Sequence, residues 1–422
     1  MGHFMQRIAG VFWTFLRLGL IAFGGPVAHM GYYRRWFVED RAWLSDAAYA
    51  QLVALCHMLP GPSSSQTGFA IGIHRAGLAG GVAAWLGFTL PSALIMIAIG
   101  IGVTRLGDFA FAGWLQGLKL AAIAIVANAL YGMARQLCPD RARAAIAAGA
   151  ALGATLLPGV TGQIGMIAAG GVIALIAFRP TTGVTSELSV PLTRMHGAIA
   201  LALFAGGMLA IGLPWGGADP LWGVLYRSGA LVFGGGHVVL PLLEAGLVAP
   251  GLMDGEHFLA GYGAAQAVPG PIFTFGGYLG AQLVPDQALA AGLLAIVVIF
   301  APGLLLVAGL LPFWKALSGY SRVQQALLGI NAAVVGLLAA VLWDPLLTVG
   351  ISNAADLVIA TTALAAITAP LASKMAVKTM HPLSAATVEA AMTLVAVMLI
   401  AALMSRTQVT IPSFGDMRWA LL

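Results

Sequence analysis

The fold of this chain is decided by the stretch Leu59-Pro60-Gly61-Pro62-Ser63-Ser64-Ser65-Gln66, which returns 209 residues later as Val268-Pro269-Gly270-Pro271-Ile272-Phe273-Thr274-Phe275. Each copy lies inside a long apolar stretch. Two prolines around a glycine remove backbone donors, clash with the preceding helical turn and permit a sharp bend. We therefore expect two matched helix breaks, Pro60-Gly61-Pro62 (the first break) and Pro269-Gly270-Pro271 (the second break).

The composition places these breaks in a membrane protein. The chain has 422 residues, of which 60% are hydrophobic and 8% charged, against roughly 25% charged in an average soluble domain. A spanning helix needs about 20 mostly apolar residues, so there is room for roughly a dozen. The formal charge of +5 comes from Lys and Arg that lie between apolar stretches. It therefore favours oriented membrane loops over a nucleic-acid surface.

Other motifs repeat with nearly the same spacing. Phe23-Gly24-Gly25 returns as Phe233-Gly234-Gly235, 210 residues later, and Pro91 returns as Pro302, 211 residues later. Half of the 422-residue length is also 211. An order kept over most of the chain indicates two homologous halves. We expect an N-terminal repeat at 1–190, a connecting helix at 191–219 and a C-terminal repeat at 220–422.

The apolar runs give the expected helices, with a run near 9 to 30 retained as the first. Runs of the first half lie near 9–30, 47–74, 77–104, 112–134, 142–157 and 162–178, and those of the second near 221–240, 257–283, 287–312, 323–344, 354–370 and 384–404. One run, near 196 to 213, has no partner. Because lipid does not tolerate open sheet edges, the sequence predicts an all-α polytopic membrane protein with about 12 or 13 transmembrane elements.

Loop charges predict that the two halves have opposite orientations. The loop after the first helix carries Arg34, Arg35 and Arg41, whereas the matching loop of the second half carries Glu244, Asp254 and Glu256 and no Lys or Arg. Since cytoplasmic loops collect Lys and Arg, matched loops of opposite character should lie on opposite sides of the membrane. The sequence therefore predicts two inverted-topology repeats.

The breaks are also the best candidates for a binding site. Backbone groups freed inside the hydrocarbon layer must be satisfied by protein or by a water-filled cavity. A half-helix that starts at Pro62 presents free N–H groups and hydroxyls at its positive end, where an anion is stabilised. The candidate substrate-binding residues are Pro60, Gly61, Pro62, Ser63, Ser64, Ser65 and Gln66 in the first half and Pro269, Gly270, Pro271 and Thr274 in the second.

A dianion needs more positive charge than two helix ends supply. Lys119 lies inside an apolar run, and its repeat counterpart is Asn331. A charge within a membrane segment is a functional hypothesis by default, so we expect both to contact substrate. The alternative is a lysine that reaches a helix end.

Three further groups are supporting candidates. His57 and its counterpart Gln266 precede the breaks by three residues and could donate to substrate or sense protonation. The alternative, which the residue type favours, is a satisfied core histidine. The glycine-rich segments could open another backbone break or allow close helix packing. Their residues are Phe23, Gly24, Gly25 and Pro26, and Gly234, Gly235 and His237.

Taken together, these motifs resemble the chromate ion transporter family. The resemblance rests on Phe-Gly-Gly-Pro near the start, on the first break and on Phe88-Thr89-Leu90-Pro91-Ser92. In the second half it rests on Phe233 to His237, the second break and 329–336. It covers nearly the whole chain, as in long two-domain members. It implies antiparallel halves and a secondary transporter that exports chromate across the bacterial inner membrane and confers chromate resistance.

Other functions are compatible with parts of the sequence. Sulfate has the shape and charge of chromate, so transport of sulfate or another oxyanion on the same scaffold stays open. An intramembrane enzyme is disfavoured because the sequence has no HExxH or GxSxG motif. A structural or sensory protein would leave the duplicated breaks unexplained. We expect no enzyme activity, no cofactor, no metal and no nucleic acid; the expected partners are the oxyanion, the bilayer and, as an open alternative, a second copy in a homodimer.

Overall fold

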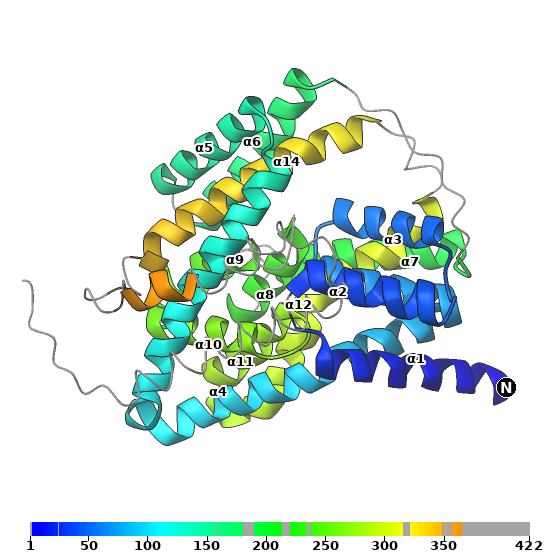
Figure 1. Ribbon diagram of the computed structural model, residues 1–422, viewed down its shortest axis with the longest axis horizontal. Coiled ribbons are helices and arrows are strands. Elements are labelled where there is room, and N and C mark those ends of the chain that lie inside the picture. The colour runs from blue at the N-terminus through cyan, green and yellow to red at the C-terminus, as the bar shows by residue number, and fades with distance from the viewer. Residues whose placement is uncertain are drawn as a thin grey trace, which may run out of the picture.

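The computed structural model describes residues 2–23, 25–157, 159–179, 190–212, 220–233, 238–314, 321–347, 351, 356 and 358–364. These residues form helices and turns and contain no strand. In Figure 1 the helices surround a centre that contains α8, α9 and α12, with α1 and part of α4 below it and α5, α6 and α14 above. The predicted all-helical architecture is confirmed, and the number of membrane crossings stays a prediction.

The described part of the first half contains six α-helices, and the Phe-Gly-Gly motif separates the first two of them. They are α1 (Gly2–Ile21), α2 (Gly25–Arg34), α3 (Asp46–Met58), α4 (Ser63–Leu137), α5 (Arg141–Leu156) and α6 (Val160–Ala177). The single first helix predicted at 9 to 30 is wrong, because α1 ends at Ile21 and α2 begins at Gly25 with a φ of 72°. A positive φ is not compatible with a continuous helix and favours glycine.

The long helix α4 contains a reversal that matches the predicted boundary between two apolar runs. Gly77 has a φ of 65°. On either side of it, Gly72 and Gly80 are so close that a Cβ on either glycine would collide with the other's carbonyl oxygen. A second turn precedes the last part of α4, which rises on the left of Figure 1.

The second half follows a similar order after α7 (Arg194–Gly207), which lies within the segment predicted to connect the halves. Its helices are α8 (Pro220–Leu231), α9 (Val239–Leu247), α10 (Gly255–Ala267), α11 (Phe275–Leu283), α12 (Ala288–Leu310) and α14 (Ser321–Val341). A short helical stretch also covers 358–364. Matched N-caps start the helices before the two breaks: Ser45 accepts from Ala48 N–H at 3.1 Å, and Asp254 accepts from Glu256 N–H at 2.8 Å.

Small residues let helices of the two halves approach closely. α5 and α6 pack on α14, where Gly336 lies against the backbone of Ala147 and Ala151. In the second half, Ala363 packs against Ala124 of α4. Positions 336 and 363 are the repeat counterparts of 124 and 151, so each half packs one of its last helices on the other half. Close approach of this kind is the usual role of small residues in membrane helices.

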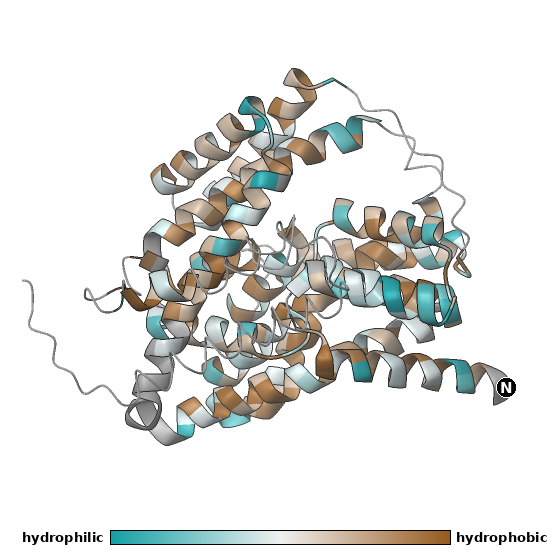
Figure 2. Ribbon diagram, in the orientation of Figure 1, coloured by the Kyte–Doolittle hydropathy of each residue, from teal (hydrophilic) through white to brown (hydrophobic). Residues whose placement is uncertain are grey.

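The outer surface is apolar. Among the described residues, five segments are long and apolar enough to cross a membrane: Phe4–Ile21, Ser63–Arg105, Arg194–Ile211, Pro285–Phe313 and Ser321–Val341. Figure 2 shows hydrophobic residues along α1, α4 and α12. Ile176 and Leu156 are 81% and 69% exposed, a placement that suits contact with lipid rather than with water.

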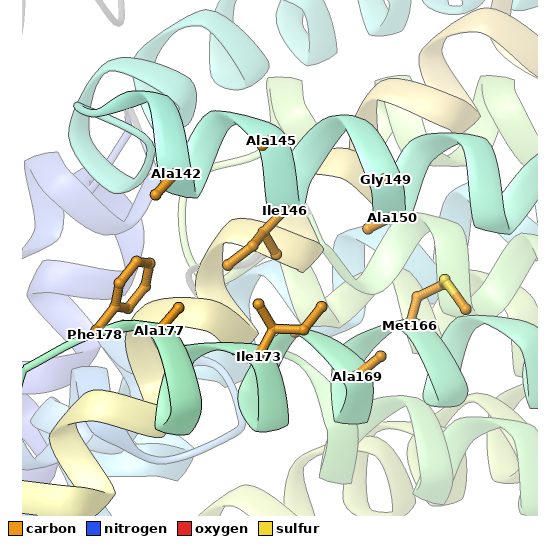
Figure 3. A pocket seen from close by; sticks show the side chains of 11 residues that line it. Ala142, Ala145, Ile146, Gly149, Ala150, Met166, Ala169, Ile173, Ala177 and Phe178 are labelled. Carbon is orange, nitrogen blue, oxygen red and sulfur yellow. The ribbon is translucent and has the colours of Figure 1, made fainter.

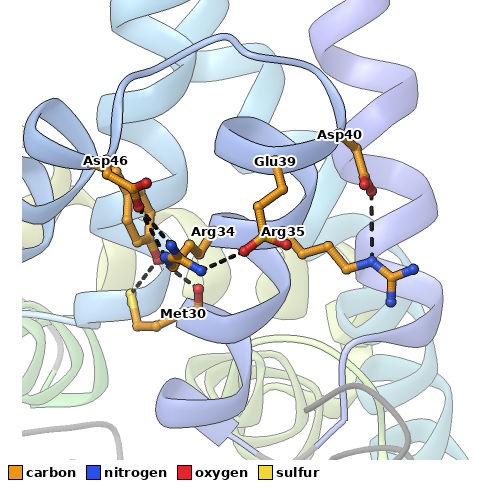
Figure 4. Close-up of polar contacts among 7 residues, drawn as sticks. Met30, Arg34, Arg35, Glu39, Asp40 and Asp46 are labelled. Atoms are coloured by element: carbon orange, nitrogen blue, oxygen red, sulfur yellow. Dashed lines mark hydrogen bonds and ion pairs between the residues drawn. The ribbon is translucent and has the colours of Figure 1, made fainter. Parts of the chain in front are cut away.

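The end of α2 and the π-helical turn that follows it (Arg35–Asp40) pair their arginines with acids (Figure 4). Arg34 donates to Asp46 Oδ1 at 2.8 and 3.0 Å and also contacts Glu39, and Arg35 lies 3.8 Å from Asp40. The orientation rule counts Lys and Arg rather than net charge, so these pairs do not weaken the inverted-topology prediction.

Candidate functional site

Both Pro-Gly-Pro segments break their helices as predicted. α3 ends at Met58 and α4 begins at Ser63, while α10 ends at Ala267 and a short 3-10 turn begins at Ile272. The central glycines Gly61 and Gly270 have φ values of 130° and 114°. Residues with side chains rarely adopt these values, so glycine is required at the centre of each break.

Each break is held by the other half of the chain. Gly61 N–H donates to Val232 O at 2.6 Å, and Gly270 N–H donates to Ala22 O at 2.9 Å. Ala22 and Val232 are repeat counterparts, 210 residues apart, and each directly precedes a Phe-Gly-Gly motif. Two crossed hydrogen bonds therefore tie the end of each first helix to the opposite break.

A second crossed contact supports the same arrangement. A Cβ on Gly61 would lie 2.9 Å from Gly303 Cα, and a Cβ on Gly270 would lie 2.6 Å from Ser92 Oγ. Ser92 and Gly303 are again counterparts, each directly after a proline inside a helix. The prediction from the sequence did not include these two residues, although the shared Pro91 and Pro302 motif pointed to their neighbourhood.

Buried polar groups gather at the first break. Ser63 and Ser65, at the N-terminus of α4, are 5% and 1% exposed, and neither hydroxyl has a hydrogen-bond partner among the described residues. Gln66 is fully buried; its Nε2 donates to Pro60 O at 2.8 Å and to Gly303 O at 3.1 Å, while Oε1 has no partner there. Buried polar groups without partners are costly, and the usual explanation is a ligand, an ion or water.

The second break has different surroundings. Thr274 Oγ1 donates to Pro271 O at 2.9 Å, so its hydroxyl is already used. The position of Gln66 is taken by Phe275, which is fully buried and packs against the rings of Phe258 and Tyr278 at 5.3 and 6.0 Å. This break is closed by aromatic packing.

A small cavity lies between the second break and the start of α2. Its volume is about 20 Å³, and its lining consists of Ala22, Gly25, Pro26, Ala265, Gln266, Val268, Gly270 and Ile272. This space holds about one water molecule. The structure thus brings the predicted Gly25, Pro26, Gln266 and Gly270 together, in a closed arrangement.

A larger cavity has the wrong chemistry for an oxyanion. It measures about 390 Å³ and lies between α5 and α6, with Ile146, Met166, Ile173 and Phe178 among its lining (Figure 3). No residue of its lining carries a polar side chain. A dianion would lose its hydration there without any replacement.

The remaining predicted residues have varied positions. His57 lies in the last turn of α3 with its side chain exposed. Asn331, in α14, has a buried Oδ1 without a partner among the described residues. Phe23 is half-buried between α1 and α2. Outside the described part of the chain lie the Lys119 side chain and all of Gly24, Gly234, Gly235 and His237.

Comparison with known proteins agrees with the duplicated architecture. The family model described as Chromate transporter matches twice, at residues 9–213 and 220–414. A chromate transport protein of Pseudomonas aeruginosa is 31% identical over 361 residues, which cover 81% of this chain and 84% of the relative. One of Cupriavidus metallidurans is 26% identical over 76% of this chain and 78% of the relative. No solved structure matches. The two helix breaks, the apolar helices and both matches together show that this multi-pass membrane protein belongs to the chromate transporter family.

Proposed function

We propose that the chain is a secondary transporter, not an enzyme, that exports chromate across a bacterial inner membrane and so confers chromate resistance. The observation that carries the proposal is the cluster of buried polar groups at the first break, formed by Ser63, Ser65 and Gln66, whose free atoms have no partner among the residues that the structure describes. Hydroxyls can donate to an oxyanion, and the N-terminus of a helix favours negative charge. A tetrahedral dianion would accept hydrogen bonds from the hydroxyls and would be stabilised by the helix N-terminus.

The site needs further donors to hold a dianion. A helix N-terminus supplies about half a positive charge, so one end offsets only a quarter of chromate's charge. In this proposal Lys119 supplies a full charge and Asn331 an amide, and both approach the first break when substrate is bound. Ser64 and the backbone of both breaks complete the site.

Movement of substrate would require the crossed contacts to open. We propose that repeats at 1–190 and 220–422, joined by the helix within 191–219, are inverted in the membrane and rock against each other. Gly61 with Val232 and Gly270 with Ala22 are single hydrogen bonds between the halves. Parting them on one side at a time would give alternating access to the first break.

The membrane potential would supply the driving force. Moving two negative charges out of an inside-negative cell releases about 4.6 kcal/mol per 100 mV, twice the value for one charge. Protons that move inward in exchange would add to this free energy. In this proposal export needs no hydrolysis of ATP.

Chromate flux into proteoliposomes, with an imposed potential and sulfate as competitor, tests the proposal. We expect flux that follows the potential, resists excess sulfate and falls in the double variant S63A/S65A. Thr274→Val, which removes a hydroxyl already bonded to Pro271 O, is the matched control and should transport normally. Flux dominated by sulfate would show that sulfate, and not chromate, is the substrate. Absence of flux for both ions would overturn transport at this site.

A further inference from the structure

His29 occupies an unusual position at the contact between the halves. It lies in α2, is 1% exposed, and its Nε2 lies 3.1 Å from Ala22 O. Ala22 O is the same atom that accepts the Gly270 N–H of the second break at 2.9 Å. The imidazole therefore shares its acceptor with one of the two crossed hydrogen bonds. In the proposed transport cycle this bond breaks when the site opens to one side of the membrane.

The hydrogen-bond pattern fixes the protonation state of His29 in this closed arrangement. A carbonyl oxygen only accepts, so Nε2 must carry the hydrogen. Nδ1 is buried and has no partner among the described residues, so it keeps its lone pair. A second proton there would create a buried cation without a partner, which is strongly unfavourable. His29 is therefore neutral while the contact is closed.

The groups that face His29 are uncharged. Ala22 comes from the end of α1, and Phe88 of α4 presents its ring edge-on to the imidazole at 5.1 Å. The other titratable groups on α2 itself are the phenols of Tyr32 and Tyr33 and the guanidinium of Arg34. Tyr33 packs on the same Phe88 ring at 5.6 Å, and Arg34, at the end of the helix, pairs with Glu39 and Asp46. Among the described residues, no carboxylate or cation interacts electrostatically with His29. Its charge is then controlled by water and by whatever anion reaches it.

The small cavity at the second break gives water or an oxyanion a route to His29. Gly25 and Pro26 line it and lie four and three residues before His29 on α2, which places them on the same face of the helix. If the Ala22 and Gly270 contact parts, this cavity becomes continuous with the face that carries His29. Water or an oxyanion could then reach Nδ1.

The matched position in the second half lacks this chemistry. The counterpart of His29, 210 residues later, is Val239, which is fully buried. The Val232 and Gly61 contact thus has no titratable group at the position that His29 occupies next to Ala22 and Gly270. Among the described residues, the hydrogen bond at the second break has a histidine on its accepting carbonyl and the one at the first break has none.

We propose that His29 is the proton-binding residue of the transport cycle. It takes up one proton on Nδ1 from the side to which the Ala22 and Gly270 contact opens, in exchange for the departing oxyanion. It gives that proton to water on the opposite side of the membrane later in the cycle, because the buried cation has no partner once the contact has closed. This inference rests on the proposed transport function and adds to it the group that links oxyanion movement to proton movement.

The direct test compares wild type with His29→Gln in chromate-transporting proteoliposomes that contain a pH-sensitive dye. Glutamine keeps an N–H donor for Ala22 O but cannot titrate. We expect wild type to move protons in exchange for chromate and H29Q to lose proton movement while it keeps chromate flux under an imposed potential. His196→Gln is the matched control, because His196 is exposed at the start of α7 and glutamine also suits its capping box.

Equal proton movement in H29Q and wild type would overturn the role of His29 and leave chromate transport intact. Absence of chromate flux in wild type would instead remove the proposed function. Should H29Q fail to fold, histidine hydrogen–deuterium exchange at Cε1 of the wild-type protein gives the answer. We expect His29 to titrate between about pH 5 and 8 only with chromate present; identical exchange profiles with and without chromate would contradict the proposal.

Discussion

The two breaks share a backbone and differ in chemistry. Both have a glycine with φ above 110° between two prolines, and both donate that glycine's N–H to the opposite half. Around the first break, however, Ser63 and Gln66 are buried with polar atoms that have no partner in the described part of the chain, whereas the second break is filled by Phe275. Both copies of the duplicated sequence thus have the same broken backbone, but the free polar groups occur in the first copy. Backbone geometry and substrate chemistry can therefore be tested separately.

The largest expected effect concerns the shared backbone. Gly61→Ala should prevent stable folding or lower the melting temperature most, because the strained φ costs about 1–3 kcal/mol and the new Cβ would lie 2.9 Å from the Gly303 backbone. Gly270→Ala carries the same strain, but its nearest neighbour is Ser92 Oγ, the end of a side chain. We expect it to be milder, and the added change Ser92→Gly to restore part of the loss. Thermal unfolding of the purified proteins in detergent measures both.

Gly10→Ala is the control for this pair. Gly10 lies inside α1, and a Cβ added there would have nothing within 4 Å, while alanine in a helix is favoured over glycine by about 1 kcal/mol. It should melt at or above the wild-type temperature. Melting of G61A at the wild-type temperature would show that the first break does not need its glycine.

The next effect concerns the chemistry in which the breaks differ. Ser63→Ala and Ser65→Ala should each raise the KM for chromate about tenfold, since a hydrogen bond to a charged group contributes about 1.5–3 kcal/mol. Thr274→Val should leave KM within about twofold, because its hydroxyl already donates to Pro271 O, and should cost about 1 kcal/mol of stability instead. Initial rates of chromate uptake across a concentration series measure these values. Equal rises in KM for all three variants would remove the distinction between the breaks.

The sequence was sufficient for the features that depend on local chemistry. Pro-Gly-Pro can only break a helix, and the repeat spacing predicted that both breaks would have the same form. The crossed contacts were not predictable, because the groups that hold Gly61 and Gly270 are the backbone carbonyls of Val232 and Ala22. A carbonyl is present at every residue, so no sequence signal marks those two.

Side-chain roles were predicted less completely for a similar reason. Gln66 looked like a substrate ligand, yet its amide N–H₂ also joins Pro60 O to Gly303 O across the halves. Whether a polar residue is free or already bonded depends on partners far along the chain. Thr274 shows the opposite case, since its hydroxyl bonds locally and is not available to a ligand in this arrangement.

The smallest expected effect concerns the matched N-caps of α3 and α10, which precede the two breaks. Ser45 does not titrate, whereas Asp254 accepts from the N–H groups of Glu256 and His257 at 2.8 and 3.1 Å. Partial burial raises the pKa of Asp254, but these hydrogen bonds outweigh it and hold the pKa below its usual value of 3.8. The ionised cap therefore stabilises the protein fully above about pH 4 and is lost as the pH falls through the lowered pKa.

Exchanging the two capping residues separates the pH-dependent stabilisation by Asp254 from that of the other carboxylates. Asp254→Ser keeps a capping oxygen, so it should change stability little at neutral pH but lose less on acidification, while Ser45→Asp should lose more than wild type. A cap contributes about 1 kcal/mol, which limits the expected shift in melting temperature to a few degrees. The measurement is melting temperature against pH from about 6 down to 3, taken as the difference from wild type so that groups common to all three proteins cancel. If D254S kept the full acid sensitivity of wild type, the ionised cap would not distinguish the approach to the second break from the approach to the first.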